Sequence, residues 1–289
     1  MTYRGRFAPS PSGEMHAGSL MTAMASYLDA KSHYGKWLVR IEDIDRERSS
    51  VNAAKKIIEV LYAHGMVPDE NIIWQSNRNN FYQKAFDKLL KNIYPCLCSR
   101  KEISNFLLKN PKSKQLCPRF CRNGIENESQ IKSWKIKLPK VNNYSDEISF
   151  HDRFYGLVCE RLSAIEDFII KRSNGNWAYQ LAVVVDDDIQ NISDIVRGDD
   201  LIESTFKQIF LQEILKFDTP RYLHIPVLKN DTGQKLSKQN GAEPICLSNP
   251  IRNLTDASQK LNLQLNTYAK NSLNSFWSSA ISAWARKYL

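Results

Sequence analysis

The chain has 289 residues, of which 42% are hydrophobic and 25% are charged. This composition predicts one large or two modest globular domains and excludes collagen, a coiled coil and a disordered chain. The 40 Lys and Arg residues outnumber the 31 Asp and Glu residues, and the resulting net charge of +9 favours a polyanionic partner such as nucleic acid.

The sequence shows no membrane span and no export signal. The longest purely apolar run, residues 181–185, is far shorter than the ~18 residues that a span requires. Residues 1–7 place two arginines before any apolar block, so they contain no hydrophobic core of a signal peptide. We therefore expect a cytoplasmic protein with no membrane partner.

Strand and helix patterns alternate at the start of the chain. Residues 5–9 are predicted to form a strand, and residues 19–31 a helix, because apolar side chains recur there at helical spacing. A strand at 37–41 and a helix at 53–64, ended by Gly65, repeat the order. This alternation is typical of α/β proteins with a parallel sheet.

The α/β pattern is interrupted and then resumes. Residues 94–150 are rich in Cys, Pro and Lys and have little periodicity outside 134–138, so they are interpreted as an inserted subdomain. Beyond it, 167–172 and 181–186 are β-rich runs and 201–217 is a predicted helix. The 49 residues after Asn240 form a predicted helical appendage. The expected segments are 1–93 and 151–240 for the two halves of the core, 94–150 for the insert and 241–289 for the appendage.

A turn rich in Pro and Gly separates the first strand from the first helix. It runs from Arg6 to Gly13 and continues into His16, Gly18 and Ser19. Backbone N–H groups at a helix start, an imidazole and close-approach glycines can together bind the phosphates of ATP. A His-x-Gly sequence alone would also suit a capped helix start, but the whole segment from Arg6 to Ser19 is a more specific indication of phosphate binding.

Two lysines lie in a second loop. Lys235 and Lys238 follow the turn 231–234, and mobile ammonium groups can stabilise charge that grows on phosphoryl oxygens in a transition state. Taken alone, the same residues would also suit a solvated surface loop. Neither a P-loop nor a dinucleotide-binding fingerprint occurs elsewhere in the sequence.

Four cysteines lie in two close pairs within the insert. A single structural Zn²⁺ would suit this set, because four thiolates fill a tetrahedral site and leave no position for a water. Free buried thiols are the alternative. Cys159 and Cys246 stand alone, and His33, His64, His151 and His224 have no metal-like spacing. The predicted zinc ligands are Cys96, Cys98, Cys117 and Cys121.

The insert is also the most basic part of the chain. Residues 100–122 contain seven Lys or Arg residues and one acid, Glu102. Such a patch suits an RNA backbone, although a solvated surface has the same composition.

These motifs together resemble the catalytic core of the class I glutamyl-tRNA synthetases, and they occur in family order over residues 4–240. Two departures are small: Ser19 stands where the general class I signature has a second histidine, and Leu236 replaces a methionine. The matching residues are 6–13, 16–18, 40–43, 167–168, 179, 183–187, 196–198 and 235–238.

The resemblance implies a binding site for each substrate. A glutamate needs two cations and one anion. Arg6 would meet its side-chain carboxylate, Arg197 its α-carboxylate and Glu42 its ammonium group. The remaining implied glutamate-binding residues are Phe7, Ala8, Pro9, Ser10 and Tyr179. The implied ATP-binding residues are Pro9, His16, Gly18, Ser19 and Lys238, and His16, Lys235 and Lys238 are the implied catalytic residues.

The short C-terminal part and the cysteine insert narrow the resemblance. Forty-nine residues after the lysine loop cannot hold anticodon-reading domains, and the chain resembles the glutamyl-queuosine tRNA(Asp) synthetases, whose usual form has tyrosine at the position of Cys117. That resemblance implies ATP-dependent activation of L-glutamate, with Mg²⁺ beside the phosphates, and transfer to queuosine in tRNA(Asp). Two alternatives remain: a truncated conventional synthetase that charges a tRNA 3′ end, and a catalytically idle RNA-binding protein.

Overall fold

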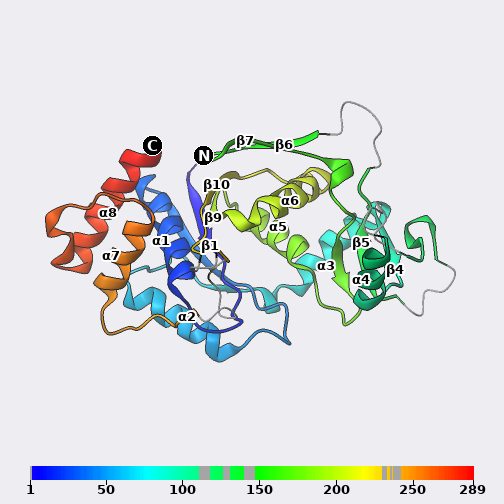
Figure 1. The fold of residues 1–289 in the computed structure, drawn as a ribbon, viewed down its shortest axis with the longest axis horizontal. Coiled ribbons are helices and arrows are strands. Elements are labelled where there is room, and N and C mark those ends of the chain that lie inside the picture. The colour runs from blue at the N-terminus through cyan, green and yellow to red at the C-terminus, as the bar shows by residue number, and fades with distance from the viewer. Residues whose placement is uncertain are drawn as a thin grey trace.

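The computed structural model describes residues 2–110, 118–125, 131–139, 147–229, 233–234, 236 and 242–289. The predicted α/β fold is confirmed, since a seven-stranded sheet in the order β3-β2-β1-β9-β10-β6-β7 forms the centre of the protein (Figure 1). Neighbouring strands are parallel except for the β6–β7 hairpin. The strands are β1 Arg4–Phe7, β2 Lys36–Ile41, β3 Ile73–Trp74, β6 Glu147–Asp152, β7 Gly156–Arg161, β9 Asp194–Gly198 and β10 Arg221–Ile225.

Helices cover both faces of the sheet, and alternate residues of its buried strands enter two different cores. In β2, Trp37 and Val39 pack with one helix layer, whereas Leu38 packs with the other, because successive side chains of a strand point to opposite faces. The first layer contains α1 Ala17–Ser32, α2 Val51–Ala63, α7 Pro250–Lys260 and α8 Leu273–Tyr288. The second contains α3 Asn79–Lys88, α5 Tyr179–Ile189 and α6 Ile202–Leu215.

The prediction of a β-rich run at 181–186 is wrong. These residues lie inside helix α5, where Leu181 to Val185 are all buried. The helix packs against α3, α6 and the small sheet described below. A helix that is enclosed on several sides is apolar all round, and a short apolar run cannot by itself distinguish such a helix from a buried strand. The other predicted strands and helices are confirmed within two residues at each end.

A small antiparallel sheet lies beside the main one, at the end of the molecule that carries α4 Arg100–Lys109 (Figure 1). Its strands are β4 Ile93–Cys96, β5 Ser133–Ile136 and β8 Ile169–Arg172, in that order. Strand β8 comes from the sequence after the predicted insert, and β6 from the end of the insert pairs with β10 of the main sheet. The predicted insert therefore contributes a strand to the main sheet, and the predicted core contributes a strand to the small sheet.

The C-terminal helix α8 is connected to α1 by a hydrogen bond to Asp29, a fully buried residue of α1. Its carboxylate accepts hydrogen bonds from Tyr3 Oη at 2.5 Å, from Trp284 Nε1 at 2.9 Å and from the Arg153 guanidinium at 2.6 and 2.9 Å. These donors come from the start of β1, from α8 and from the β6–β7 turn. Among the described residues, none of the helices has both the length and the apolar character needed to cross a bilayer.

Candidate active site

A cavity of about 220 Å³ lies where the carboxyl ends of β1 and β9 meet the start of α1. The chain leaves β1 toward β2 on one side, while β9 lies on the other, so this is the point where the strand order reverses. Open parallel sheets bind their ligands at such a place. The predicted site residues that line the cavity are Arg6, Phe7, Ala8, Pro9, Ser10, His16, Gly18, Ser19, Tyr179 and Arg197.

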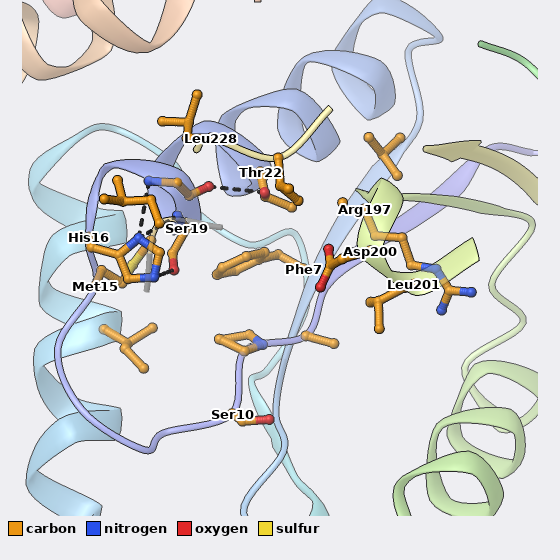
Figure 2. A pocket seen from close by; sticks show the side chains of 18 of the residues that line it. Phe7, Ser10, Met15, His16, Ser19, Thr22, Arg197, Asp200, Leu201 and Leu228 are labelled. Carbon is orange, nitrogen blue, oxygen red and sulfur yellow. Dashed lines mark hydrogen bonds between the residues drawn. The ribbon is translucent and has the colours of Figure 1, made fainter. Parts of the chain in front are cut away.

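His16 caps the first helix at the edge of this cavity (Figure 2). Its Nδ1 accepts hydrogen bonds from the backbone N–H groups of Gly18 at 3.2 Å and Ser19 at 3.4 Å. Nε2 therefore carries the proton and donates to Ser19 Oγ at 3.2 Å. The sequence predicts that these backbone groups approach ATP, but here the imidazole occupies them, because the first donors of a helix need an acceptor. The small side chain at position 19 holds the ring in place.

Arg6 is 4% exposed and is paired with a residue to which the sequence assigned no role. Its Nε and Nη2 each lie 3.2 Å from an oxygen of Asp187 in α5, and Arg40 Nη1 lies 2.8 Å from Asp187 Oδ1. Burial raises the pKa of Asp187, but the two guanidinium groups outweigh this effect and hold it below its usual value. Arg6 therefore faces the cavity with its orientation set by Asp187.

Glu42 follows the end of β2 and is 6% exposed. Its side chain receives a long hydrogen bond, 3.4 Å, from Arg40 Nη2. Burial raises the pKa of Glu42 to about 7, although Arg40 and Arg6 oppose the shift. A buried carboxylate with so weak a contact is suited to bind a cation that enters the site.

A second cavity of about 230 Å³ adjoins the first. Glu42 lines this second cavity, whereas Arg6 and Arg197 line the first. Ser10 and Tyr179 line both cavities. The three charged residues thus approach the Ser10–Tyr179 boundary from two sides. A ligand that contacts all three would lie across this boundary.

Arg197 at the end of β9 is buried and is held by three neighbours. It donates from Nη1 to Gln208 Oε1 at 2.8 Å, from Nη2 to Thr205 Oγ1 at 2.7 Å and from Nε to His224 Nε2 at 3.1 Å. Nothing in the sequence connects His224 with the site, because a histidine without metal-like spacing predicts only a packing or surface role. Figure 2 shows Arg197 and Asp200 on the side of the cavity that faces Phe7.

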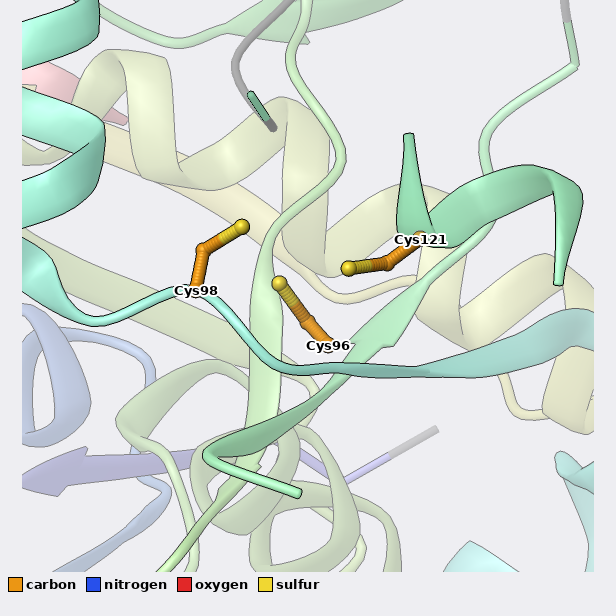
Figure 3. A group of neighbouring side chains, drawn as sticks. All are labelled: Cys96, Cys98 and Cys121. Carbon is orange, nitrogen blue, oxygen red and sulfur yellow. The ribbon is translucent and has the colours of Figure 1, made fainter. Parts of the chain in front are cut away.

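Three of the four predicted metal ligands come together in the small sheet. The sulfur atoms of Cys96, Cys98 and Cys121 lie within 4.8 Å of one another, and all three residues are buried (Figure 3). The backbone N–H of Leu97 donates to Cys121 Sγ at 3.4 Å. This group could hold a metal ion. Cys117, Lys235 and Lys238 lie outside the described residues, whereas Leu236, between the two lysines, lines the first cavity.

Comparisons with known proteins identify the family of the chain. Residues 2–256 match the family model described as tRNA synthetases class I (E and Q), catalytic domain. The solved glutamate–tRNA synthetase of Elizabethkingia anophelis is 26% identical with a TM-score of 0.71; the match covers 83% of this chain but only 53%, about half, of that protein.

Two curated relatives match over nearly their whole length. The glutamyl-Q tRNA(Asp) synthetase of Janthinobacterium sp. (strain Marseille) is 48% identical, and that of Verminephrobacter eiseniae (strain EF01-2) is 43% identical. Each match covers 99% of this chain and 98% of the relative. The chain therefore belongs to the glutamyl-Q tRNA(Asp) synthetases, within the class I synthetase family for glutamate and glutamine.

Proposed function

We propose that the protein activates L-glutamate with ATP and transfers the glutamyl group to queuosine in tRNA(Asp). The observation that carries the activation step is the position of Arg6 and Arg197 in the wall of one cavity and of Glu42 in the wall of the adjoining one. Two cations and one anion match the charges of free glutamate. The names of the curated relatives support the acceptor.

In the first step, an α-carboxylate oxygen of glutamate attacks the α-phosphorus of ATP and pyrophosphate leaves. Arg6 binds the side-chain carboxylate, Glu42 binds the ammonium group and Arg197 holds the α-carboxylate toward the phosphate. The Tyr179 hydroxyl contributes a further hydrogen bond, and Phe7, Ala8, Pro9 and Ser10 form the wall of the site. The protein accelerates this step by positioning and by charge stabilisation, since no enzyme nucleophile takes part.

ATP lies in the first cavity, next to Pro9, His16, Gly18 and Ser19. His16, Lys235 and Lys238 act on the phosphate chain, and Mg²⁺ accompanies ATP. In the second step, a hydroxyl of queuosine attacks the carbonyl carbon of the adenylate and AMP leaves. The basic insert contacts the phosphates of the RNA.

The transfer step is tested with tRNA(Asp) that carries queuosine but lacks its 3′ adenosine. We expect this RNA to accept glutamate, and queuosine-free tRNA(Asp) to accept none. Glutamate-dependent ATP–pyrophosphate exchange, measured without RNA, checks the activation step separately. Loss of charging after the 3′ trim would instead favour a conventional synthetase that acts on the 3′ end, and absence of exchange in every condition would favour an RNA-binding protein.

Glutamate binding is expected to weaken as the pH falls through 7. Glu42 has a pKa raised to about 7 by burial, so below that pH its neutral form predominates and no longer pairs with the ammonium group. The KM for glutamate in the exchange reaction should rise about tenfold between pH 8 and pH 6. The E42Q variant should show a high KM at every pH. A wild-type KM that is constant over this range would contradict the role of Glu42.

Zinc is the metal that the insert is proposed to bind, one ion per chain, because thiolates are the ligands that structural zinc prefers. Cys96, Cys98 and Cys121 are already gathered, and Cys117 supplies the fourth thiolate. The ion stabilises the fold and takes no part in the reaction.

Elemental analysis of protein purified under reducing conditions should find one zinc per chain. The C98S variant should lose most of it, whereas C159S, which changes an exposed and isolated cysteine, should retain it. Equal zinc content in the two variants would show that Cys98 is no ligand.

A further inference from the structure

A chain of buried polar groups runs behind Arg197 across three neighbouring strands. The sheet register places His224 of β10 beside Arg197 of β9, and Tyr222 of β10 beside Asp152, the last residue of β6. Asp152 and His224 are both fully buried. The polar chain therefore begins at the hairpin strand and ends at the substrate cavity.

Asp152 determines which nitrogen of His224 carries a proton. Its Oδ2 lies 2.7 Å from His224 Nδ1 and also accepts from the His224 backbone N–H at 3.0 Å. Its Oδ1 accepts from the backbone N–H groups of Phe154 and Tyr155, both at 2.9 Å. A carboxylate with this many donors remains charged, so the proton of the imidazole stays on Nδ1. Nε2 is left as an acceptor.

The acceptor on His224 lies between a donor of Arg197 and the Thr205 hydroxyl, whose Oγ1 is 3.1 Å from His224 Nε2. Arg197 Nε lies 3.1 Å from His224 Nε2. Gln208 and Thr205 each accept one further N–H, so residues within the described part of the chain use three of the five guanidinium N–H groups. The remaining two are enough for a bidentate contact with one carboxylate.

Ring contacts hold the imidazole in its own plane. Tyr222 stacks on His224 with ring centroids 5.8 Å apart and planes 11° apart, and the Phe150 ring lies at 5.9 Å. The Arg197 guanidinium lies 5.3 Å from the centre of the same Tyr222 ring. His224 can therefore neither rotate nor withdraw without disturbing the core.

We propose that Asp152 and His224 are positioning residues that hold the Arg197 guanidinium in the orientation that binds the α-carboxylate of glutamate. The proposal rests on the proposed function, since it needs Arg197 to contact that carboxylate. Neither residue touches the substrate. Each acts through the protonation state and the orientation of the next group in the chain.

Three variants separate this role from simple packing. H224L removes the acceptor for Arg197 Nε but leaves Asp152 its three backbone donors. H224Q restores an amide oxygen in the region of Nε2. D152N changes the charge next to Nδ1, so the proton of His224 can move to Nε2, which then presents a donor to a donor. The matched control is Q212L, a buried polar side chain of α6 that bonds Tyr222 at 3.3 Å and makes no hydrogen bond to Arg197.

The experiment measures kcat and the KM values for glutamate and ATP in the exchange reaction, together with the melting temperature. H224L and D152N should raise the KM for glutamate about tenfold to 100-fold and leave the KM for ATP within about twofold of wild type. H224Q should recover most of the glutamate affinity, and Q212L should keep a normal KM for glutamate even if it melts earlier.

Two results would overturn the proposal. One is a glutamate KM near that of wild type in H224L. The other is a parallel change of both KM values and of the melting temperature in H224L, H224Q and Q212L, which would mean that His224 only fills space. Absence of exchange in the wild-type enzyme would contradict the proposed function itself and not the role of His224.

Discussion

Replacing Arg6 by alanine is expected to remove the preference for glutamate over glutamine and to lower kcat/KM for glutamate about 100-fold or more. Arg6 is buried beside the cavity, and the side-chain carboxylate of glutamate would lose its cation. Glutamine has no charge to place there, so the Arg6 N–H groups that Asp187 does not use would have no charged acceptor, and we expect the wild-type enzyme to reject glutamine. The R6A variant lacks this guanidinium, so it should no longer distinguish glutamate from glutamine.

The loss of Arg6 also leaves Asp187 with Arg40 as its remaining guanidinium partner, so the melting temperature must be measured alongside exchange with glutamate and with glutamine. R4A is the matched control: Arg4 lies two residues earlier on β1 and pairs with Glu70, which does not line the cavity. It should keep the wild-type preference. An R6A variant that still discriminates as wild type does would assign the recognition of the side chain to another residue.

Replacing Lys238 by alanine is expected to lower the exchange rate about 100-fold or more, equivalent to about 2.7 kcal/mol of transition-state stabilisation. The prediction rests on the motif of residues 235–238 and on Leu236, which lines the first cavity and whose backbone N–H donates to Leu228 O at 2.7 Å. That bond holds the middle of the motif at the cavity.

The control for Lys238 is K229A, which removes an exposed lysine that does not line the cavity. Its exchange rate should stay close to that of wild type. Near-normal exchange in K238A would exclude a catalytic role for this lysine.

The resemblance to a known family singled out Arg6, Glu42 and Arg197, which lie in separate motifs of the sequence. The structure places all three in the walls of two adjoining cavities, and their roles toward glutamate stay predictions. The sequence could not predict their partners: Asp187 lies 181 positions after Arg6, and only the packing of α5 against the sheet brings the two side chains together. The same is true of His224 and Arg197, which meet through strand register.

The prediction for residues 181–186 was wrong for a related reason. A short run of apolar residues indicates that a segment is buried but does not show whether it is a strand or a helix, and α5 is a helix that is buried on several sides. Asp186 and Asp187 follow the apolar run and are buried because they are paired: Arg6 and Arg40 bind Asp187, and Arg78, Gln75 and Tyr82 bind Asp186. The burial of the acidic residues in this helix depends on arginine side chains that are distant in the sequence.

The contacts of Asp29 have a consequence for how the protein unfolds. A buried carboxylate that loses its hydrogen-bond donors is strongly destabilising. Movement of α8 that takes Trp284 away from Asp29 would therefore also weaken the contacts of α1 with Tyr3 and Arg153. Helix α1 begins at the His16 cap, in the wall of the first cavity. The last helix of the chain and the helix that begins at His16 are therefore coupled through one buried carboxylate, and we expect them to open together during local unfolding.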